Sequence, residues 1–169
     1  MVKKSKKKSS EVFSEKKQKR YERLARLQYG PEIVNESIAR WNGYSKKKQE
    51  KIMAESGEVY SDLAKALEAG KSPTDPEVQA ILPRWHNSIR HFYEPTLEIL
   101  RGLGEMYNSD PEFIATFTQW HPRLAEYLQA AITEYVEELE RVEIERLLAE
   151  DERRTARLTG NATQDDPQI

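Results

Sequence analysis

Side chains able to do acid–base, nucleophilic or metal chemistry are few in this sequence, and their spacing matches no familiar catalytic constellation. The chain of 169 residues has no cysteine, which excludes disulfides, thiolate catalysis and cysteine-ligated zinc. His86 and His91 are five residues apart, on different sides of a helix, and His121 lies at an expected helix start. No nucleophile elbow, phosphate-binding loop or dinucleotide motif is present. We therefore expect no enzyme activity, no cofactor and no metal site.

Aromatic residues are the more informative group, because they gather in one stretch from Trp85 to Trp120. Such side chains bind flat heterocycles well, since they offer a large apolar area and stacking for a small loss of entropy. Two interpretations remain open: the residues form a plain aromatic core, or some line a pocket with His86, His91 and Glu105 at its polar rim. The candidate ligand-binding residues are Trp85, His86, Ile89, Phe92, Tyr93, Leu103, Tyr107, Phe113, Phe117 and Trp120.

Two glycines stand in the middle of this stretch, in the segment Gly102-Leu103-Gly104-Glu105-Met106-Tyr107. A glycine inside a helix costs about 1 kcal/mol relative to alanine. The segment therefore predicts the end of one helix, a bend at the two glycines and the start of another helix. The cost also indicates a close approach to the backbone, made either by a neighbouring helix or by a ligand.

Helical periodicity and helix-start signals predict that every element is an α-helix. Asp75-Pro76 and Asp110-Pro111 open helices, because aspartate caps free N–H groups and proline suits the first turn. Pro83 falls inside a predicted helix and is expected to kink it. The predicted helices cover 11–28, 32–41, 45–70, 76–93, a stretch from 95 into the glycine segment, 111–120 and 122–157. Nothing alternates like a strand, so the predicted fold class is all-α with a single domain.

Composition and charge divide the chain into four parts. We predict a disordered basic tail over 1–10, an N-terminal helix over 11–29, the ligand-binding domain over 30–140, and a helical extension with a tail over 141–169. The first 20 residues carry nine lysines or arginines against two glutamates, whereas the whole chain has a net charge of −2. The basic tail either contacts nucleic acid weakly, without sequence preference, or is simply solvated. No apolar run is long enough to span a membrane, and the cytoplasm is the expected location.

The glycine segment, followed by Asp110 and Phe113, resembles the signature of the TipAS-type antibiotic-recognition domain. The resemblance covers about residues 30–136, and its outer matches are Trp85-His86, Ile89, Phe92-Tyr93, Pro122-Arg123-Leu124-Ala125-Glu126-Tyr127-Leu128, Ala131 and Ile132. This family includes the drug-binding half of certain MerR-family transcription activators and free-standing proteins that bind thiopeptides or albicidin. The resemblance implies an all-helical, globin-like fold with a deep cleft for bulky, flat, apolar antibiotics.

Two differences from this family shape the expected function. The residues before position 30 are too few for a DNA-binding winged helix-turn-helix, so the chain resembles the free-standing form, which binds a drug and sequesters it. Some members capture thiopeptides covalently through a cysteine, whereas Pro95 and Thr96 occupy that neighbourhood here, so binding is expected to be non-covalent. The alternative function is an accessory protein that docks on nucleic acid or on a partner helix.

Apolar residues continue beyond the resembling region, in a stretch dense with glutamate and arginine. Val142, Ile144, Leu147 and Leu148 cannot all face water without a penalty. We expect them to pack against the N-terminal helix or against a second copy of the chain, which makes a homodimer one expected assembly.

Overall fold

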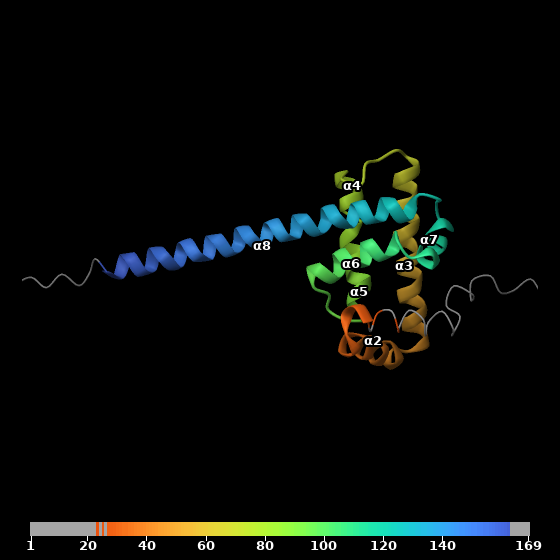
Figure 1. Cartoon of the computed structure of the whole chain (residues 1–169), viewed down its shortest axis with the longest axis horizontal. Coiled ribbons are helices and arrows are strands. Elements are labelled where there is room, and N and C mark those ends of the chain that lie inside the picture. The colour runs from red at the N-terminus through yellow and green to blue at the C-terminus, as the bar shows by residue number, and fades with distance from the viewer. Residues whose placement is uncertain (1–22, 24, 26, 163–169) are drawn as a thin grey trace, which may run out of the picture.

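The structure, a computed structural model, describes residues 23, 25 and 27–162, and these residues form helices joined by turns and loops, with no strand (Figure 1). The helices are α2 (Pro31–Gly43), α3 (Lys46–Glu68), α4 (Pro76–Gln79), α5 (Leu82–Arg90), α6 (Leu97–Tyr107), α7 (Pro111–Thr118) and α8 (Leu124–Ala162). Residues 23, 25 and 27–29 are also helical. The tail expected over 1–10 and most of the helix expected over 11–29 lie outside the described residues. The all-α prediction is confirmed.

Local signals set most helix boundaries where the sequence predicts them. The side chains of Ser45, Asp75 and Asp110 each accept a hydrogen bond from a free N–H in the first turn of α3, α4 and α7. Gly30 and Gly70 adopt left-handed backbone conformations, with φ of 89° and 75°, which other residues rarely adopt. Gly30 thus ends the helical segment before α2, and Gly70 follows the end of α3.

Pro83 separates two helices instead of kinking one, so the prediction of a single helix over 76–93 is wrong. α4 ends at Gln79 and α5 begins at Leu82, which places Pro83 in the first turn of α5. Proline has no N–H to donate and fixes φ near the helical value, and both properties favour the first turn over the interior.

The glycine segment does not bend. Gly102 and Gly104 both lie within the continuous helix α6, so the predicted two-glycine bend is wrong. The predicted close approach is confirmed, and a neighbouring helix makes it at Gly104. A Cβ atom placed there would lie 3.1 Å from Cγ2 of Ile132 in α8. A Cβ atom on Gly102 would lie 3.3 Å from the Tyr29 hydroxyl, so each glycine makes room for a different neighbour.

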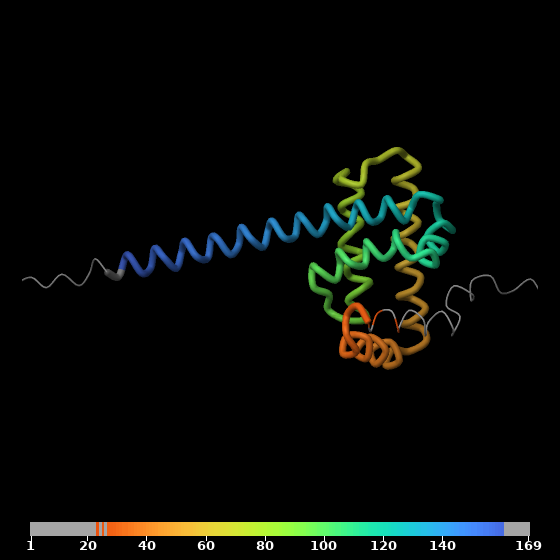
Figure 2. The backbone as a smooth tube through the Cα atoms, viewed as in Figure 1, coloured from red at the N-terminus to blue at the C-terminus, as the bar shows by residue number. Residues whose placement is uncertain are grey.

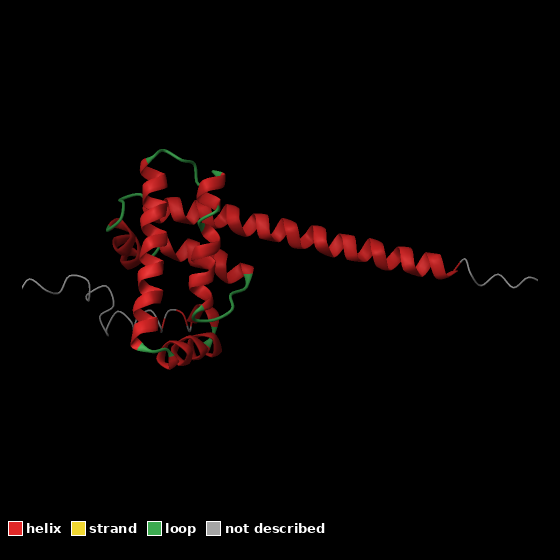
Figure 3. Ribbon diagram, turned by 180° about the vertical axis from the view of Figure 1, so that it is seen from behind, coloured by secondary structure: helices red, strands yellow, loops and turns green. Residues whose placement is uncertain are grey.

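Two groups of helices cross one another and enclose the core (Figures 1 and 3). α6 and α8 lie side by side, and they cross the group formed by α3, α4 and α5. α2 closes one end of this second group, and α7 lies beside α8 on the flank of the domain (Figure 2). The largest fully buried side chains come from both groups: Trp85, Leu63, Leu82, Leu100, Leu124, Leu128, Ile132, Val78 and Val136.

Helix α8 is much longer than the domain, and its C-terminal half projects as an arm (Figures 1 and 2). It runs to Ala162, beyond the predicted end at 157. Val142, Ile144, Leu147 and Leu148 are each at least 50 % exposed, so they do not pack against the described end of the N-terminal helix. Most of the N-terminal helix lies outside the described residues, and packing against a second copy of the chain stays a prediction. None of the helices that the structure describes is both long and apolar enough to cross a lipid bilayer.

Candidate functional site

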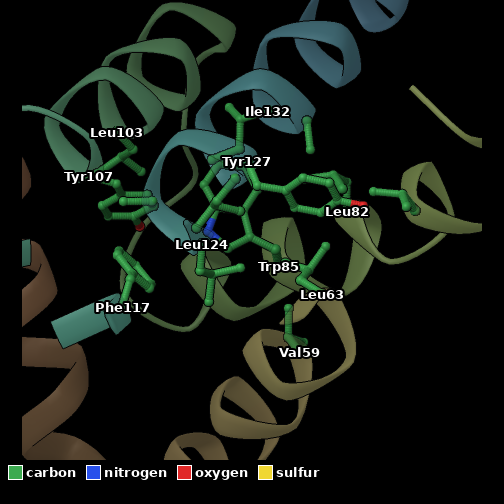
Figure 4. Close-up of a cluster of buried hydrophobic side chains, with 14 of the residues drawn as sticks. Val59, Leu63, Leu82, Trp85, Leu103, Tyr107, Phe117, Leu124, Tyr127 and Ile132 are labelled. Carbon is green, nitrogen blue, oxygen red and sulfur yellow. The ribbon is translucent and has the colours of Figure 1, made fainter. Parts of the chain in front are cut away.

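Most of the ten candidate residues lie in or against one aromatic cluster, part of which is drawn in Figure 4. The buried members are Trp85, Leu103, Tyr107 and Phe117. The half-buried members that pack against the core are Ile89, Tyr93, Phe113 and Trp120. Phe92 has a different partner, because its ring stacks on that of Trp41 in α2 at 5.4 Å between centroids.

Ring contacts join the buried aromatics into a network centred on Tyr107. Its ring meets those of Phe117, Phe113 and Trp85 at centroid distances of 5.1, 5.4 and 6.4 Å. Tyr60, which the sequence analysis did not place among the candidates, packs edge-on against Phe117 at 5.0 Å. Edge-on and tilted aromatic pairs stabilise a core beyond the area that they bury. Core packing therefore accounts for the rings of this network.

The polar tips of these side chains need a further explanation. Burial raises the pKa of Tyr60 to about 12 and raises the pKa of Tyr107 well above its ordinary value. The pKa of Tyr93 is raised by burial and then by its neighbour Tyr29. After burial, the tyrosines Tyr60, Tyr93 and Tyr29 also raise the pKa of Tyr107, so four tyrosines interact electrostatically in the domain.

Two buried polar atoms of this cluster have no hydrogen bond of good geometry within the described residues, the Tyr29 hydroxyl and the Trp85 indole nitrogen. The indole nitrogen has polar neighbours in Tyr60 and Tyr107, whereas the Tyr29 hydroxyl lies against the bare backbone of Gly102. Buried polar atoms without partners cost free energy. The Tyr29 hydroxyl therefore marks a place where a bound molecule that supplies a partner would be stabilised.

His86 is buried between α5 and α8. Its Nδ1 lies 2.9 Å from the Tyr135 hydroxyl, and its Nε2 is buried without a hydrogen-bond partner among the described residues. Burial lowers the pKa of His86, and Arg90 lowers it further, so the ring is uncharged near neutral pH. This pair ties α5 to α8. No group of histidine, aspartate and glutamate in the described part of the chain could hold a metal ion.

A cavity of about 560 Å³ opens beside the Tyr29 end of this cluster. It is lined by Leu27 and Gln28 before α2, by Gly102, Glu105 and Met106 of α6, and by Ser109, Asp110 and Pro111 at the α6–α7 junction. Its volume is in the range of clefts that bind drug-sized molecules. The glycine segment thus forms one wall of the cavity, and Glu105 adds to the effect of burial in raising the pKa of Tyr29.

None of the ten candidate residues lines this cavity, and sequence reasoning did not select Leu27, Gln28 or Ser109, which do. These three residues stand at the end of a helix and in a turn, where periodicity carries no information. The signal that could have found them is Gly102, because a glycine in a helix marks a face that something approaches closely. Tyr29, an aromatic residue directly before the Gly30 break, is a second such signal.

A second cavity, of about 330 Å³, lies at the start of α3. It is lined by Lys47, Lys48 and Lys51 together with Ser45, Ile52, Glu55 and His91. The Lys48 ammonium group lies 4.1 Å from the centre of the Tyr44 ring. Because three lysines surround this cavity, it suits an apolar heterocycle less well than the first, and we place the candidate site in the first cavity.

Proteins of known sequence share this domain. Residues 21–135 match the TipAS antibiotic-recognition domain family. The HTH-type transcriptional activator mta of Bacillus subtilis (strain 168) is 35% identical over 127 residues, which are 75% of this chain and 49% of that protein. The HTH-type transcriptional regulator SkgA of Caulobacter vibrioides (strain NA1000 / CB15N) is 32% identical over 127 residues, 72% of this chain and 50% of that protein. The chain therefore spans about half the length of these curated relatives.

A solved structure of TipAS from Streptomyces lividans, in complex with nosiheptide, has the same fold. It aligns with a TM-score of 0.66 over 80% of this chain and 96% of that chain, at 24% sequence identity. This likeness confirms the globin-like helical fold that the resemblance implied. Since the family match covers more than half of the chain and relatives above 30% identity share it, the chain belongs to the TipAS antibiotic-recognition domain family.

Proposed function

We propose that this chain binds bulky aromatic or heterocyclic antibiotics non-covalently, in the cavity between the segment before α2 and helix α6. The observation that carries the proposal is the position of the cavity, one wall of which is the glycine segment that resembles the family signature. Family membership and the nosiheptide complex of TipAS support the class of ligand.

The cavity lining suits a large, flat ligand with a few polar groups. Leu27 is 81% exposed, and Met106 is half-buried with a flexible thioether, so both offer apolar surface that a ligand would cover. Glu105 and Ser109 offer polar contacts on the same lining. The unpaired Tyr29 hydroxyl lies behind Gly102, so a small shift of its ring would let it donate to a ligand.

The ten candidate residues keep two roles in this proposal. Tyr93 and Tyr107 do not line the cavity, but both interact electrostatically with Tyr29, which lies beside it. The remaining candidates do not line the cavity, and they stabilise the domain that carries it: Trp85, His86, Ile89, Phe92, Leu103, Phe113, Phe117 and Trp120. A rigid domain keeps the cavity open at a small entropic cost to binding.

Binding on this proposal involves no chemical step. The chain has no cysteine, so no thiol can add to an unsaturated residue of a thiopeptide. The buried titratable ring of His86 is bonded to Tyr135 and lies outside the cavity lining. We therefore propose a binding module and not an enzyme.

The biological role that fits this module is sequestration of a drug, or the effector part of a regulator. Both curated relatives are transcription regulators, and the part of them that this chain matches is about half of their length. We also propose that the basic segment 1–20 contacts nucleic acid weakly. The location that fits either role is the cytoplasm.

Thermal unfolding with nosiheptide, an albicidin-like oligoamide and a flat dye tests the ligand class. A ligand at about 100 times its dissociation constant should add about 2.7 kcal/mol to the free energy of unfolding, which raises the melting temperature. After denaturation, mass spectrometry should return the unmodified chain. A mass increase of one drug molecule that survives denaturation would refute non-covalent binding, and a melting temperature unchanged by the whole panel would refute the ligand class.

A further inference from the structure

The projecting arm of α8 carries an apolar stripe that no described part of the chain covers. Ile144, Leu148 and Leu158 expose 57%, 60% and 69% of their surfaces. Together with Asp151 and Thr155, which are also exposed, they follow one another at alternating spacings of four and three residues. Such spacing places all five on one line along a helix, as in the seam of a coiled coil.

This stripe lies on the opposite side of α8 from the face that packs in the domain. Leu124 and Leu128 are fully buried, and each stands 20 residues before a stripe residue, Ile144 or Leu148. Twenty residues correspond to about 5.6 turns, so the buried and the exposed side chains point in nearly opposite directions. A partner helix can therefore lie along the arm without meeting the domain (Figure 1).

The stripe is complementary to itself when a second copy runs antiparallel. About a two-fold axis at position 153, Leu148 of one copy faces Leu158 of the other, and Asp151 of one faces Thr155 of the other. Leucine thus meets leucine, and a carboxylate meets a hydroxyl that can donate to it. We propose that the arms of two copies form a short antiparallel coiled coil over residues 144–162.

Charge favours this arrangement over a parallel one. In a parallel pair in register, the two Asp151 carboxylates would face each other in the seam, and like charges in contact repel. In the antiparallel pair the two carboxylates are about 6 Å apart along the axis, and each has a Thr155 hydroxyl opposite. The two-fold symmetry also closes the assembly at two copies.

The rest of the arm agrees with this geometry. On the face away from the stripe, Arg146 forms ion pairs with Glu143 and Glu150, each at 2.7 Å. These charged groups therefore already have partners within the same helix. The overlap from 144 to 162 is about 28 Å long and ends before it reaches the domain of the second copy. Because it spans fewer than three heptads and has polar layers, we expect a dimer in the micromolar range.

The mass of the full chain in solution, measured by sedimentation at rising concentration, tests the pairing. The wild type should pass from monomer to dimer at micromolar to submillimolar concentration. The double variant Leu148→Lys with Leu158→Lys should bind itself at least about 100-fold more weakly, because four charges enter the seam. Val142→Lys is the matched control, since Val142 is 53% exposed on the same arm but lies off the stripe.

The Val142→Lys variant should dimerise like the wild type, and equal melting temperatures would show that all the variants are folded. A wild type that stays monomeric over this range would overturn the proposal. A Val142→Lys variant that loses the dimer as strongly as the double variant would overturn the assignment of the stripe.

Engineered disulfides test whether the two arms run antiparallel or parallel, because the natural chain has no cysteine that would interfere. After mixing and oxidation, Leu148→Cys chains should cross-link to Leu158→Cys chains far more than either variant cross-links to itself. Dominant self-linking of the Leu148→Cys variant would establish a parallel pair and overturn the antiparallel one. Absence of every cross-link, at a concentration where sedimentation shows dimers, would place the interface elsewhere and also overturn the proposal.

Discussion

Tyr29, Tyr60, Tyr93 and Tyr107 bring four hydroxyls into the neighbourhood of the aromatic core. Phenylalanine would fill the same space without a polar atom that needs a partner. The rings are therefore explained by packing, and the Tyr60 and Tyr107 hydroxyls have polar neighbours in one another and in Trp85, whereas the buried Tyr29 hydroxyl has no partner among the described residues. The proposed ligand site gives the Tyr29 hydroxyl a use, because an antibiotic rich in amide and heterocyclic acceptors can receive its hydrogen bond.

The buried tyrosines should make the domain unfold in alkali. Burial holds the pKa of Tyr60 at about 12 in the folded state, against an ordinary value of 10.0 in the unfolded chain. Between these values the unfolded chain loses a proton that the folded chain keeps, so this contribution to stability is complete below about pH 10 and falls as the pH rises towards 12.

Tyrosinate absorbance, followed together with circular dichroism, checks this prediction. Ionisation and unfolding should coincide, and Tyr60→Phe should reduce the alkaline loss of stability. The prediction fails if every tyrosine ionises near pH 10 while the helices remain intact.

His86 should destabilise the domain in acid. Burial lowers its pKa from the ordinary 6.5, so below that pH the unfolded chain takes up a proton that the folded chain does not. The contribution of the uncharged His86 ring to the free energy of unfolding is therefore fully present above about pH 6.5, and it decreases as the pH falls below that value. Urea unfolding at about pH 7.5 and about pH 5 measures the effect. His86→Gln, which can still bond to Tyr135, should lose part of this pH dependence, and an unchanged dependence would assign it to other groups.

At the scale of elements, the contact between α6 and α8 depends on Gly104. Ile132 is fully buried, so it has no room to move away from a Cβ atom that would lie 3.1 Å from its Cγ2. We predict that Gly104→Ala lowers the free energy of unfolding by about 1–3 kcal/mol. Gly57→Ala is the matched control, because Gly57 also lies inside a helix but has no atom within 4 Å of the added methyl group.

The Gly57→Ala variant should be stabilised by up to about 1 kcal/mol, the ordinary gain in helix propensity. Urea denaturation of both variants gives the two values. Equal stabilisation of the two would show that α6 and α8 are not closely packed at Gly104.

Helix boundaries were predictable from the sequence wherever a local signal decides them. The side chains of Ser45 and Asp110 cap their helices by accepting hydrogen bonds from the first turn. Gly70 adopts a left-handed backbone conformation, which glycine tolerates better than other residues. Pro83 and Gly104 misled the prediction, because each signal has two structural outcomes. A proline can kink a helix or start one, and a glycine can bend a helix or admit a neighbour. Only tertiary packing selects between them.

The candidate site was less predictable than the fold. Aromatic residues at helical spacing mark both a core and a pocket wall, and in the structure the rings of Trp85 and Phe117 pack in the core. The cavity arises where the segment before α2 meets the end of α6, two parts of the chain far apart in sequence. Leu27 and Ser109 carry no pattern that would join them. The glycine segment is the part of the site that sequence alone could locate.

The whole molecule separates into a domain and an arm, and α8 belongs to both. The family match ends at residue 135, and the apolar stripe begins at Ile144, after α8 has left the domain. An antiparallel pair of arms would therefore hold two ligand cavities at opposite ends of one rod. Ligand binding and self-association use different residues, so each can be abolished without the other.

Calorimetric titration of nosiheptide into the full chain tests the central claim most directly, with one variant that fills the cavity and one that does not. Ser109→Trp places an indole in the cavity lining, whereas Ala115→Trp places the same group on the exposed face of α7, outside it. We predict one nosiheptide per chain for the wild type and for Ala115→Trp, and at least about tenfold weaker binding for Ser109→Trp, a loss of about 1.4 kcal/mol. A wild type that does not bind, or a Ser109→Trp variant that binds as tightly as the wild type, would contradict the account.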